Sequence, residues 1–218
     1  STVFRYTSLF RSASGLRLKN PFDVCSDSAG RVFITDVSLG VIRIDPVKGE
    51  FLALGQKSRV SLGNTRGICW GAGKVVIGMV DMGRVGVFTP DGELLSWIGQ
   101  MGQFPNPLDV VYDAGRHRLL IVDNKLHSVF VYSETGDSLF AIGKRGEGEG
   151  EFNFPQSAAV DPEGNIYVVD AFNFRVQIFD VNGKFLRAFG KQGNVYGAFL
   201  RPKGIALDSH KNIYVLDA

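Results

Sequence analysis

The sequence predicts an all-β fold, a β-propeller built from four-stranded antiparallel blades. Three observations predict it. A unit of about 45 residues recurs along the chain, and its clearest copies are residues 154–171 and 201–218. Each unit holds four short runs rich in Val, Ile, Phe and Tyr, separated by turn residues. No window shows sustained helical periodicity, so the repeated unit is a small sheet.

The boundaries of the blades follow from two markers that agree with each other. An apolar run ending in glycine closes each of the first four units, as at Gly143 and Gly190. An anchor residue precedes the first strand of every unit: Pro21, Thr65, Pro107, Pro155 and Pro202. Both markers recur at nearly the same interval, which indicates consecutive blades.

The best-preserved unit predicts the strands of one blade in order. They are residues 157–160, 165–169, 175–179 and 185–189. Turn sequences such as Asp-Pro-Glu-Gly separate them, and β-branched and aromatic residues suit their pleated surface. The Gly-rich residues 146–150 carry acidic side chains and precede a strand. They therefore predict a crossover between blades and not a phosphate-binding loop.

The chain is predicted to form a single domain over residues 1–218, because 44% of its residues are hydrophobic, 27 are glycine and no linker interrupts the repeats. The fifth unit has only two strands before Ala218. We therefore expect a six-bladed ring in the full protein, incomplete at the C-terminus here, with residues 3–6 as its closing outer strand. A five-bladed ring is the alternative. A first residue Ser1 is compatible with a processed, exported protein.

Charge and hydropathy argue against two kinds of partner. The net charge is +2, and no run of Lys and Arg is interleaved with aromatic residues, so a nucleic-acid partner is not expected. The longest apolar run, residues 75–80, is far shorter than the roughly 20 residues that cross a bilayer. No transmembrane segment is predicted.

Aspartates supply the candidate metal ligands. Asp23 and Asp109 follow their anchors by two residues, where an innermost strand begins near one mouth of the central channel. Converging carboxylate oxygens can hold calcium, whereas capping a turn or binding channel water is the alternative role. Another aspartate ends the second strand of every unit: Asp36, Asp81, Asp123, Asp170 and Asp217. We interpret this set as structural, bonding to turn amides or to an arginine.

Histidines and cysteines give no catalytic pattern. His117 and His210 fall in turns between first and second strands, and His127 follows a second strand, so they share no metal-binding spacing. No nucleophile motif is present, and no catalytic residue is predicted. Cys25 and Cys69 occupy matching positions in the first two units, where later units have small apolar residues. They are predicted to be free thiols buried between blades, with a disulfide as the alternative.

Several segments resemble the NHL repeat. They are Pro-Lys-Gly-Ile-Ala-Leu-Asp at 202–208, Gly-Asn-Ile-Tyr-Val-Val-Asp at 164–170, Asn-Phe-Arg-Val-Gln-Ile-Phe-Asp at 173–180, and the Gly-rich approaches at 146–155 and 193–199. The resemblance covers nearly all of the chain from Leu18 and is strongest in the last two units. The Asn-x-Arg of residues 173–175 is missing from the first and third units, which departs from the family.

The resemblance implies a propeller similar to bacterial six-bladed NHL propellers that are exported or lipid-anchored, some of which accompany multihaem cytochromes. It implies a periplasmic, extracellular or outer-membrane-associated location, with the cytoplasm as the alternative, and a protein partner such as a multihaem cytochrome. The resemblance also implies an alternative class of function, a metal-dependent enzyme. Lactonase-type propellers hold calcium in the channel, and NHL-like amidating lyases use histidines and zinc there.

The function expected from these observations is non-catalytic binding or scaffolding through protein contacts, without a cofactor. Rigid blades that carry many loops on one face are suited to recognition. Large aromatic residues make good interface anchors, and packing in the interblade core is the alternative that outweighs this role for each of the candidates: Trp70, Trp97, Tyr196 and Phe199. The alternative is a lactonase-like or lyase-like enzyme that holds Ca or Zn in the channel.

Overall fold

The computed structural model describes residues 17–55 and 60–218 and shows an all-β architecture. Four antiparallel sheets of four strands each are formed, in chain order, by β1 (Pro21–Ser26), β2 (Val32–Asp36), β3 (Gly40–Asp45), β4 (Glu50–Ala53), β5 (Thr65–Gly71), β6 (Lys74–Met79), β7 (Arg84–Phe88), β8 (Leu94–Ile98), β9 (Pro107–Asp113), β10 (Arg118–Asp123), β11 (Ser128–Ser133), β12 (Ser138–Ile142), β13 (Pro155–Val160), β14 (Ile166–Asp170), β15 (Arg175–Phe179) and β16 (Phe185–Phe189). A two-stranded sheet pairs β17 (Pro202–Leu207) with β18 (Ile213–Asp217), and a short 3-10 helix, η1 (Ala171–Asn173), follows β14.

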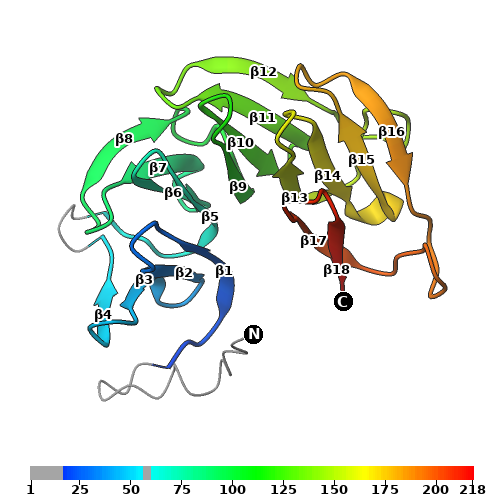
Figure 1. Cartoon of the computed structure of the whole chain (residues 1–218). Helices are drawn as coiled ribbons and strands as arrows, with labels where there is room; N and C mark the ends of the chain where they lie inside the picture. The colour runs from blue at the N-terminus through cyan, green and yellow to red at the C-terminus, as the bar shows by residue number, and fades with distance from the viewer. Residues whose placement is uncertain (1–16, 56–59) are drawn as a thin grey trace.

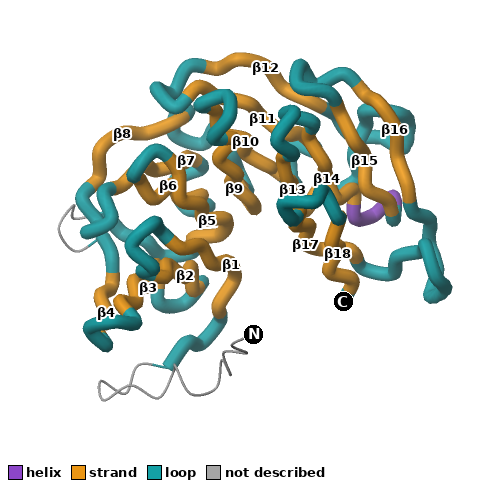
Figure 2. Tube along the Cα trace, viewed as in Figure 1, coloured by secondary structure: helices purple, strands orange, loops and turns teal. Residues whose placement is uncertain are grey.

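The sheets are arranged as the blades of a β-propeller (Figure 1). The first strand of each sheet lies innermost, and each of these strands contacts the next along the series β1, β5, β9, β13, β17. The outermost strands β4, β8, β12 and β16 follow the rim of the arc (Figure 2). The predicted fold is therefore confirmed, with four complete blades and a fifth unit of two strands. Residues 3–6, the predicted closing strand, lie outside the described residues.

Apolar side chains between adjacent blades hold the arc together. One core joins the first two blades through Phe33 and Ile77, and the next joins the second and third through Val85 and Ile121. A third core packs β10 against β14, and a fourth packs β14 against β17 and β18. Burial of these faces favours stacking, because it removes apolar surface from water. Within the described residues no helix is long and apolar enough to cross a membrane.

The strand pairing divides the loops between two faces of the propeller. The start of each innermost strand pairs with the end of the second strand, as in Pro155 with Asp170. Loops that join second and third strands, and crossovers between blades, therefore lie on one face, which we call the mouth face. The mouth-face loops are residues 37–39, 80–83, 99–106, 124–127, 143–154, 171–174 and 190–201. The remaining turns lie on the opposite face, which we call the turn face.

The anchors begin the innermost strands instead of preceding them. β13 starts at Pro155, two residues before the predicted strand. Proline is tolerated at the first position of a strand, where no ladder hydrogen bond needs its missing N–H. The propeller topology is unaffected by this correction.

The aspartates at the ends of the second strands are structural, as predicted. Asp36, Asp123 and Asp170 are fully buried. Each accepts a backbone N–H from the segment that leads into its own blade, as Asp170 does from Asn153 at 2.7 Å. The predicted pairing of residues 173–175 is also confirmed, because Asn173 Nδ2 and Arg175 Nε both donate to Asp170 Oδ2 at 2.8 Å. The Gly-rich loop is the predicted crossover, with the Gly148 carbonyl accepting from Arg175 Nη2.

Candidate binding site at the mouth of the channel

A β-bulge opens every innermost strand directly after its anchor. The register skips Phe22 in β1, Leu108 in β9 and Lys203 in β17. It skips two residues in the other inner strands, at 66–67 in β5 and 156–157 in β13. A bulged residue is released from the ladder and its side chain is re-aimed, so bulges commonly appear beside functional sites. Here they occur together on the mouth face.

The bulged residues of β1, β9, β13 and β17 line a cavity of about 480 Å³ at the mouth of the channel. Its apolar lining comes from Pro21, Phe22, Leu108, Gly204 and Leu216, and its polar lining from Asp23, Asp109, Gln156, Ser157 and Lys203. The sequence prediction had placed both aspartates at this mouth, and both line the cavity. It missed the residue directly after each anchor, although its constant position in the repeat was a signal that could have found it. A cavity of this size with mixed lining is typical of a ligand site.

Each of the two aspartates reaches the neighbouring blade. Asp23 Oδ2 accepts the N–H of Ile68 at 2.9 Å, and Asp109 Oδ2 accepts the N–H of Ala158 at 2.9 Å. The second oxygen of Asp23 accepts the N–H of Val24 at 2.8 Å. These donors fix the carboxylates at the wall of the cavity, because the backbones that supply them belong to rigid strands.

Burial disfavours the charge on both carboxylates. It raises the pKa of Asp23 to about 6, with a further contribution from the nearby Asp109 carboxylate and a partial offset by the N–H groups of Ile68 and Val24. Burial also raises the pKa of Asp109 above its usual value. The site is thus an acidic cavity whose charges are incompletely stabilised by the protein itself.

Gly67 of β5 allows this strand to pack closely against β9. A Cβ at this position would lie 2.5 Å from Asp109 Cα and 2.6 Å from Val110 N, so only glycine fits. The adjacent Arg66 places its guanidinium 4.9 Å from the centre of the Phe22 ring. In the part of the chain that the structure describes, the buried Nε of Arg66 has no hydrogen-bond partner.

The metal prediction for Asp23 and Asp109 stays a prediction. Both carboxylates accept backbone N–H groups. Residues 17–55 and 60–218 contain no group of three or more His, Cys, Asp or Glu side chains placed to hold a metal ion. The histidines lie as predicted, away from the innermost strands. His127 is buried on the mouth face, where its Nδ1 accepts the N–H of Phe154 at 3.1 Å.

The cysteines are free thiols, as predicted, but they are half-buried and not fully buried. Cys25 packs against the core between the first two blades, and Cys69 against the core between the second and third. Burial raises the pKa of Cys25 to about 12 and that of Cys69 well above its usual value, so both thiols stay protonated at neutral pH.

The four aromatic candidates separate into packed and exposed residues. Trp70 stacks on Phe33 with ring centres 6.4 Å apart, and Trp97 lies beneath the Arg84 guanidinium at 4.7 Å. Phe199 is half-buried beside Phe189. Tyr196 is fully exposed, on the crossover that leads to β17. Of the four, Tyr196 alone offers its whole ring to a partner.

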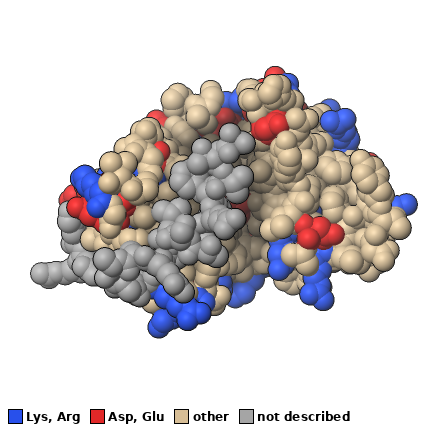
Figure 3. All heavy atoms as spheres, turned by 60° about the horizontal axis from the view of Figure 1, so that its bottom comes forward, with Lys and Arg blue, Asp and Glu red and all other residues tan. Residues whose placement is uncertain are grey.

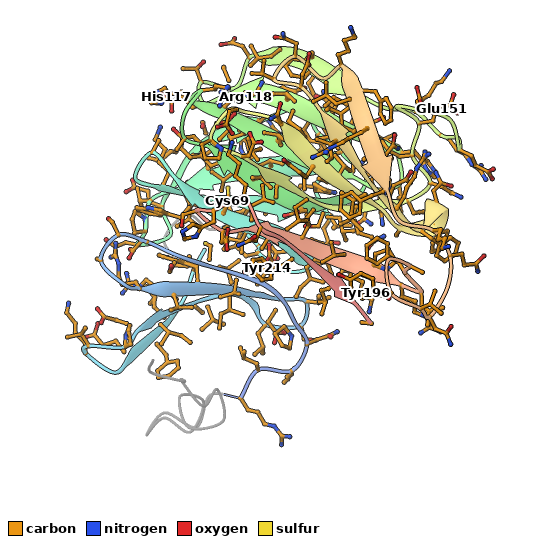
Figure 4. The ribbon with its side chains drawn as sticks, turned by 45° about the vertical axis from the view of Figure 1, so that its right-hand side comes forward. Cys69, His117, Arg118, Glu151, Tyr196 and Tyr214 are labelled. Atoms are coloured by element: carbon orange, nitrogen blue, oxygen red, sulfur yellow. The ribbon has the colours of Figure 1, made fainter. Side chains whose placement is uncertain are left out.

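The exposed apolar loop residues are concentrated on the mouth face. Among the described loops the large exposed apolar side chains of this face are Met101, Leu126, Phe172, Val195, Tyr196 and Leu200, whereas the turn face has Val47. Figure 4 shows the separation of the faces, with His117 and Arg118 on one side and Glu151 and Tyr196 on the other. Except for Tyr196, the sequence prediction missed these residues, because exposure depends on tertiary packing.

Charged groups form no single extended patch on the surface seen in Figure 3. There the Lys and Arg side chains lie in small separate groups, interspersed with Asp and Glu. This agrees with the low net charge of +2. A continuous basic stripe, the usual footprint of a nucleic-acid site, is not seen on that face.

The family comparison matches the second half of the chain. A family model described as a 6-bladed beta-propeller, DUF5128, matches residues 109–174 and 162–218. No curated protein sequence matches this chain.

Solved structures resemble the chain in fold. An auxiliary nutrient binding protein from Bacteroides ovatus is 16% identical with a TM-score of 0.76, covering 93% of this chain and 57% of that one. A virginiamycin B lyase from Staphylococcus aureus, solved with quinupristin, is 17% identical with a TM-score of 0.69, covering 90% and 63%. The structure of a nidogen/laminin complex gives 19% identity, a TM-score of 0.73, and coverage of 92% and 73%.

These identities show the fold alone. The chain spans less than two thirds of the length of the nutrient-binding protein and of the lyase. The similar folds include both binding proteins and an enzyme, and no single activity is common to them.

Proposed function

The chain belongs to the 6-bladed beta-propeller family, and from this premise we propose that it is a non-catalytic binding propeller that recognises a protein partner through its mouth face. One observation carries the proposal. The exposed apolar loop side chains gather on the face that also holds the channel cavity. Apolar groups that converge on one surface, around polar groups, are typical of interaction sites.

The loops of the mouth face are held rigidly, which favours recognition. Crossover 99–106 bonds to the second-blade loop through Gly102 N to Met82 O at 3.0 Å and Phe104 N to Gly83 O at 2.8 Å. Phe172 N donates to Asn153 O at 3.0 Å in the same way. Loops fixed before binding lose little conformational entropy on association, and this raises affinity.

Site-specific photo-crosslinking in the native host tests the proposal. A benzoylphenylalanine residue replaces Tyr196 or Phe172 on the mouth face, and Val47 on the turn face serves as the matched exposed control. We expect discrete covalent adducts from the two mouth-face positions and none from the control position. Equal adducts from Val47, or none from either mouth-face position, would overturn the proposal.

The rival proposal is a lactonase-like or lyase-like enzyme with Ca or Zn bound by Asp23 and Asp109. It is supported by the position of both carboxylates in the channel cavity. Metal analysis of the purified protein tests it: stoichiometric calcium or zinc that is lost in the Asp23→Asn and Asp109→Asn double variant would favour the enzyme. Metal-free protein that still forms the mouth-face adducts would favour the binding module.

Export to the cell envelope, with a partner such as a multihaem cytochrome, is the finer form of the binding proposal. It is supported by the resemblance to exported NHL propellers. Fractionation of the native host, followed by mass spectrometry of the Tyr196 adduct, tests both the compartment and the partner. A cytoplasmic location would remove a periplasmic cytochrome from consideration.

A further inference from the structure

We propose that the mouth cavity receives a basic side chain, a lysine or an arginine, that the partner inserts between Asp23 and Asp109. This inference rests on the proposed function, because it names the group of the partner that enters the channel. Two features of the cavity support it: apolar walls, and two carboxylates that accept backbone N–H groups but form no ion pair in the described part of the chain.

The two carboxylates are arranged to meet a cation. They come from β1 and β9, which flank β5, and Gly67 lets β5 pack closely against the backbone of Asp109. Each carboxylate is oriented by a backbone N–H of the next blade, from Ile68 and Ala158. Ligand groups held in place by rigid strands cost little to organise when a charged partner arrives.

Among the residues that the structure describes, neither carboxylate forms an ion pair, although eight such contacts occur elsewhere. Lys203 lines the same cavity, but its side chain is exposed and forms no ion pair with either aspartate in the described part of the chain. Both carboxylates are half-buried. A carboxylate that is partly removed from water without a counter-ion is destabilised, so an inserted cation would gain more here than at the open surface.

The apolar lining suits the stem of the same side chain. Phe22, Leu108 and Leu216 line the cavity together with the two carboxylates. Lysine and arginine carry an apolar methylene chain below a charged tip, and they favour sites that are apolar along the wall and acidic at the end. A bare metal ion would use the carboxylates but leave these apolar walls without a role.

Exposed apolar side chains elsewhere on the mouth face can contact the same partner. Phe172 and Tyr196 lie on that face and are exposed, so they offer further contacts to a partner that spans the face. Hot spots of interfaces commonly combine a central anchor with surrounding contacts that exclude water. The central residue of this interface comes from the partner, and the propeller supplies the cavity that receives it.

NMR titration of the full chain tests the inference directly. The probes are Nα-acetyl-lysine N-methylamide and its uncharged analogue Nα-acetyl-norleucine N-methylamide. The backbone amides of Ile68 and Ala158 are the reporters, because they donate to the two carboxylates. We expect the lysine probe to shift both amides in a saturable manner, and the norleucine probe to bind at least about tenfold more weakly.

Variants establish that the carboxylates are responsible. Asp23→Asn and Asp109→Asn keep an oxygen that can accept the same N–H, so the fold is retained, and each should weaken the lysine probe by about tenfold. Asp180→Asn on the turn face is the matched control and should leave the affinity unchanged. Equal binding of the two probes, or equal affinity of all three variants, would overturn the inference.

Two further outcomes distinguish the other occupants. If calcium chloride or zinc chloride shifts the same two amide signals at micromolar concentration, the ligand of the cavity is a metal ion, and the inference of a basic side chain is overturned. Photo-adducts at Tyr196 that survive in the Asp23→Asn and Asp109→Asn double variant, with no response to the lysine probe, would leave the proposed binding face intact and reject only its cationic anchor.

Discussion

Aspartates form different hydrogen bonds on the mouth face and on the turn face. Turn-face aspartates bond within their own turns, as Asp180 does with the N–H groups of Asn182 and Lys184. Mouth-face aspartates reach across the sequence, as Asp170 does to Asn153. Links between blades on the turn face come from arginines instead: Arg43 donates to the Pro90 carbonyl, Arg116 to the Pro162 carbonyl and Arg118 to the Val181 carbonyl. The comparison teaches that aspartates on the turn face close local turns, whereas those on the mouth face connect each blade to the segment that leads into it.

The largest expected effect on stability comes from removing one of these mouth-face aspartates. Asp170→Ala leaves Asn153, Asn173, Arg175 and Gln177 without their common buried acceptor. We expect a loss of about 3–5 kcal/mol in the free energy of unfolding, because a buried charge network is broken from one side. Urea denaturation measures it. Asp180→Ala, in the same blade but on the turn face, should cost about 1 kcal/mol, and equal losses would contradict the comparison.

Glycine substitutions give the second largest contrast. Gly67→Ala places a methyl group against the backbone of Asp109 and should cost about 1–3 kcal/mol through overpacking. Gly115→Ala on the turn face would meet only Asp113 Oδ1, at 3.6 Å, and should be close to neutral. Thermal unfolding at one pH compares the two. A neutral Gly67→Ala would show that β5 and β9 are farther apart than described.

The pH dependence of stability tests the acidic cavity of the mouth face, and Asp23→Asn is the variant to compare with the parent protein. The folded pKa of Asp23 is raised to about 6 from its ordinary 3.8, so the unfolded chain loses this proton first and the native protein loses stability as pH rises from about 4 to 6. The asparagine variant does not titrate there. Its stability relative to the parent should therefore rise by about 1–2 kcal/mol between pH 4 and pH 7. A pH-independent difference between the two proteins would show that the pKa is not raised.

The smallest effect on stability is expected at the proposed contact residue. Tyr196→Ser removes a ring that is fully exposed, so the free energy of unfolding should change by no more than about 0.5 kcal/mol. Val47→Ser on the turn face should change it equally little. Partner adducts formed by a photo-crosslinker at Phe172 should nevertheless fall in the first variant and persist in the second. Loss of adducts in both would show that the mouth face is not selective.

Much of the fold follows from the repeated sequence, whereas only the positions of Asp23 and Asp109 in the candidate site follow from it. The period of the repeat and its turn residues predicted the blades, and the recurrent aspartates predicted the hydrogen bonds of Asp170. The position after each anchor recurs in every unit, but the bulge that turns its side chain toward the cavity forms only when the strands pair, so the cavity-lining roles of Gln156 and Lys203 were missed. The exposure of Tyr196 and the burial of Trp70 likewise depend on how loops and blades meet.

The hydrogen bonds of the strand-end aspartates also bear on how the protein assembles. Asp36, Asp123, Asp170 and Asp217 each bond to a residue 17 positions earlier, so every one of these contacts closes a short stretch of chain. Short closures cost little entropy and form early. Each blade can therefore secure its own entry segment as soon as its first hairpin has emerged from the ribosome, and add to the preceding blade without waiting for distant sequence.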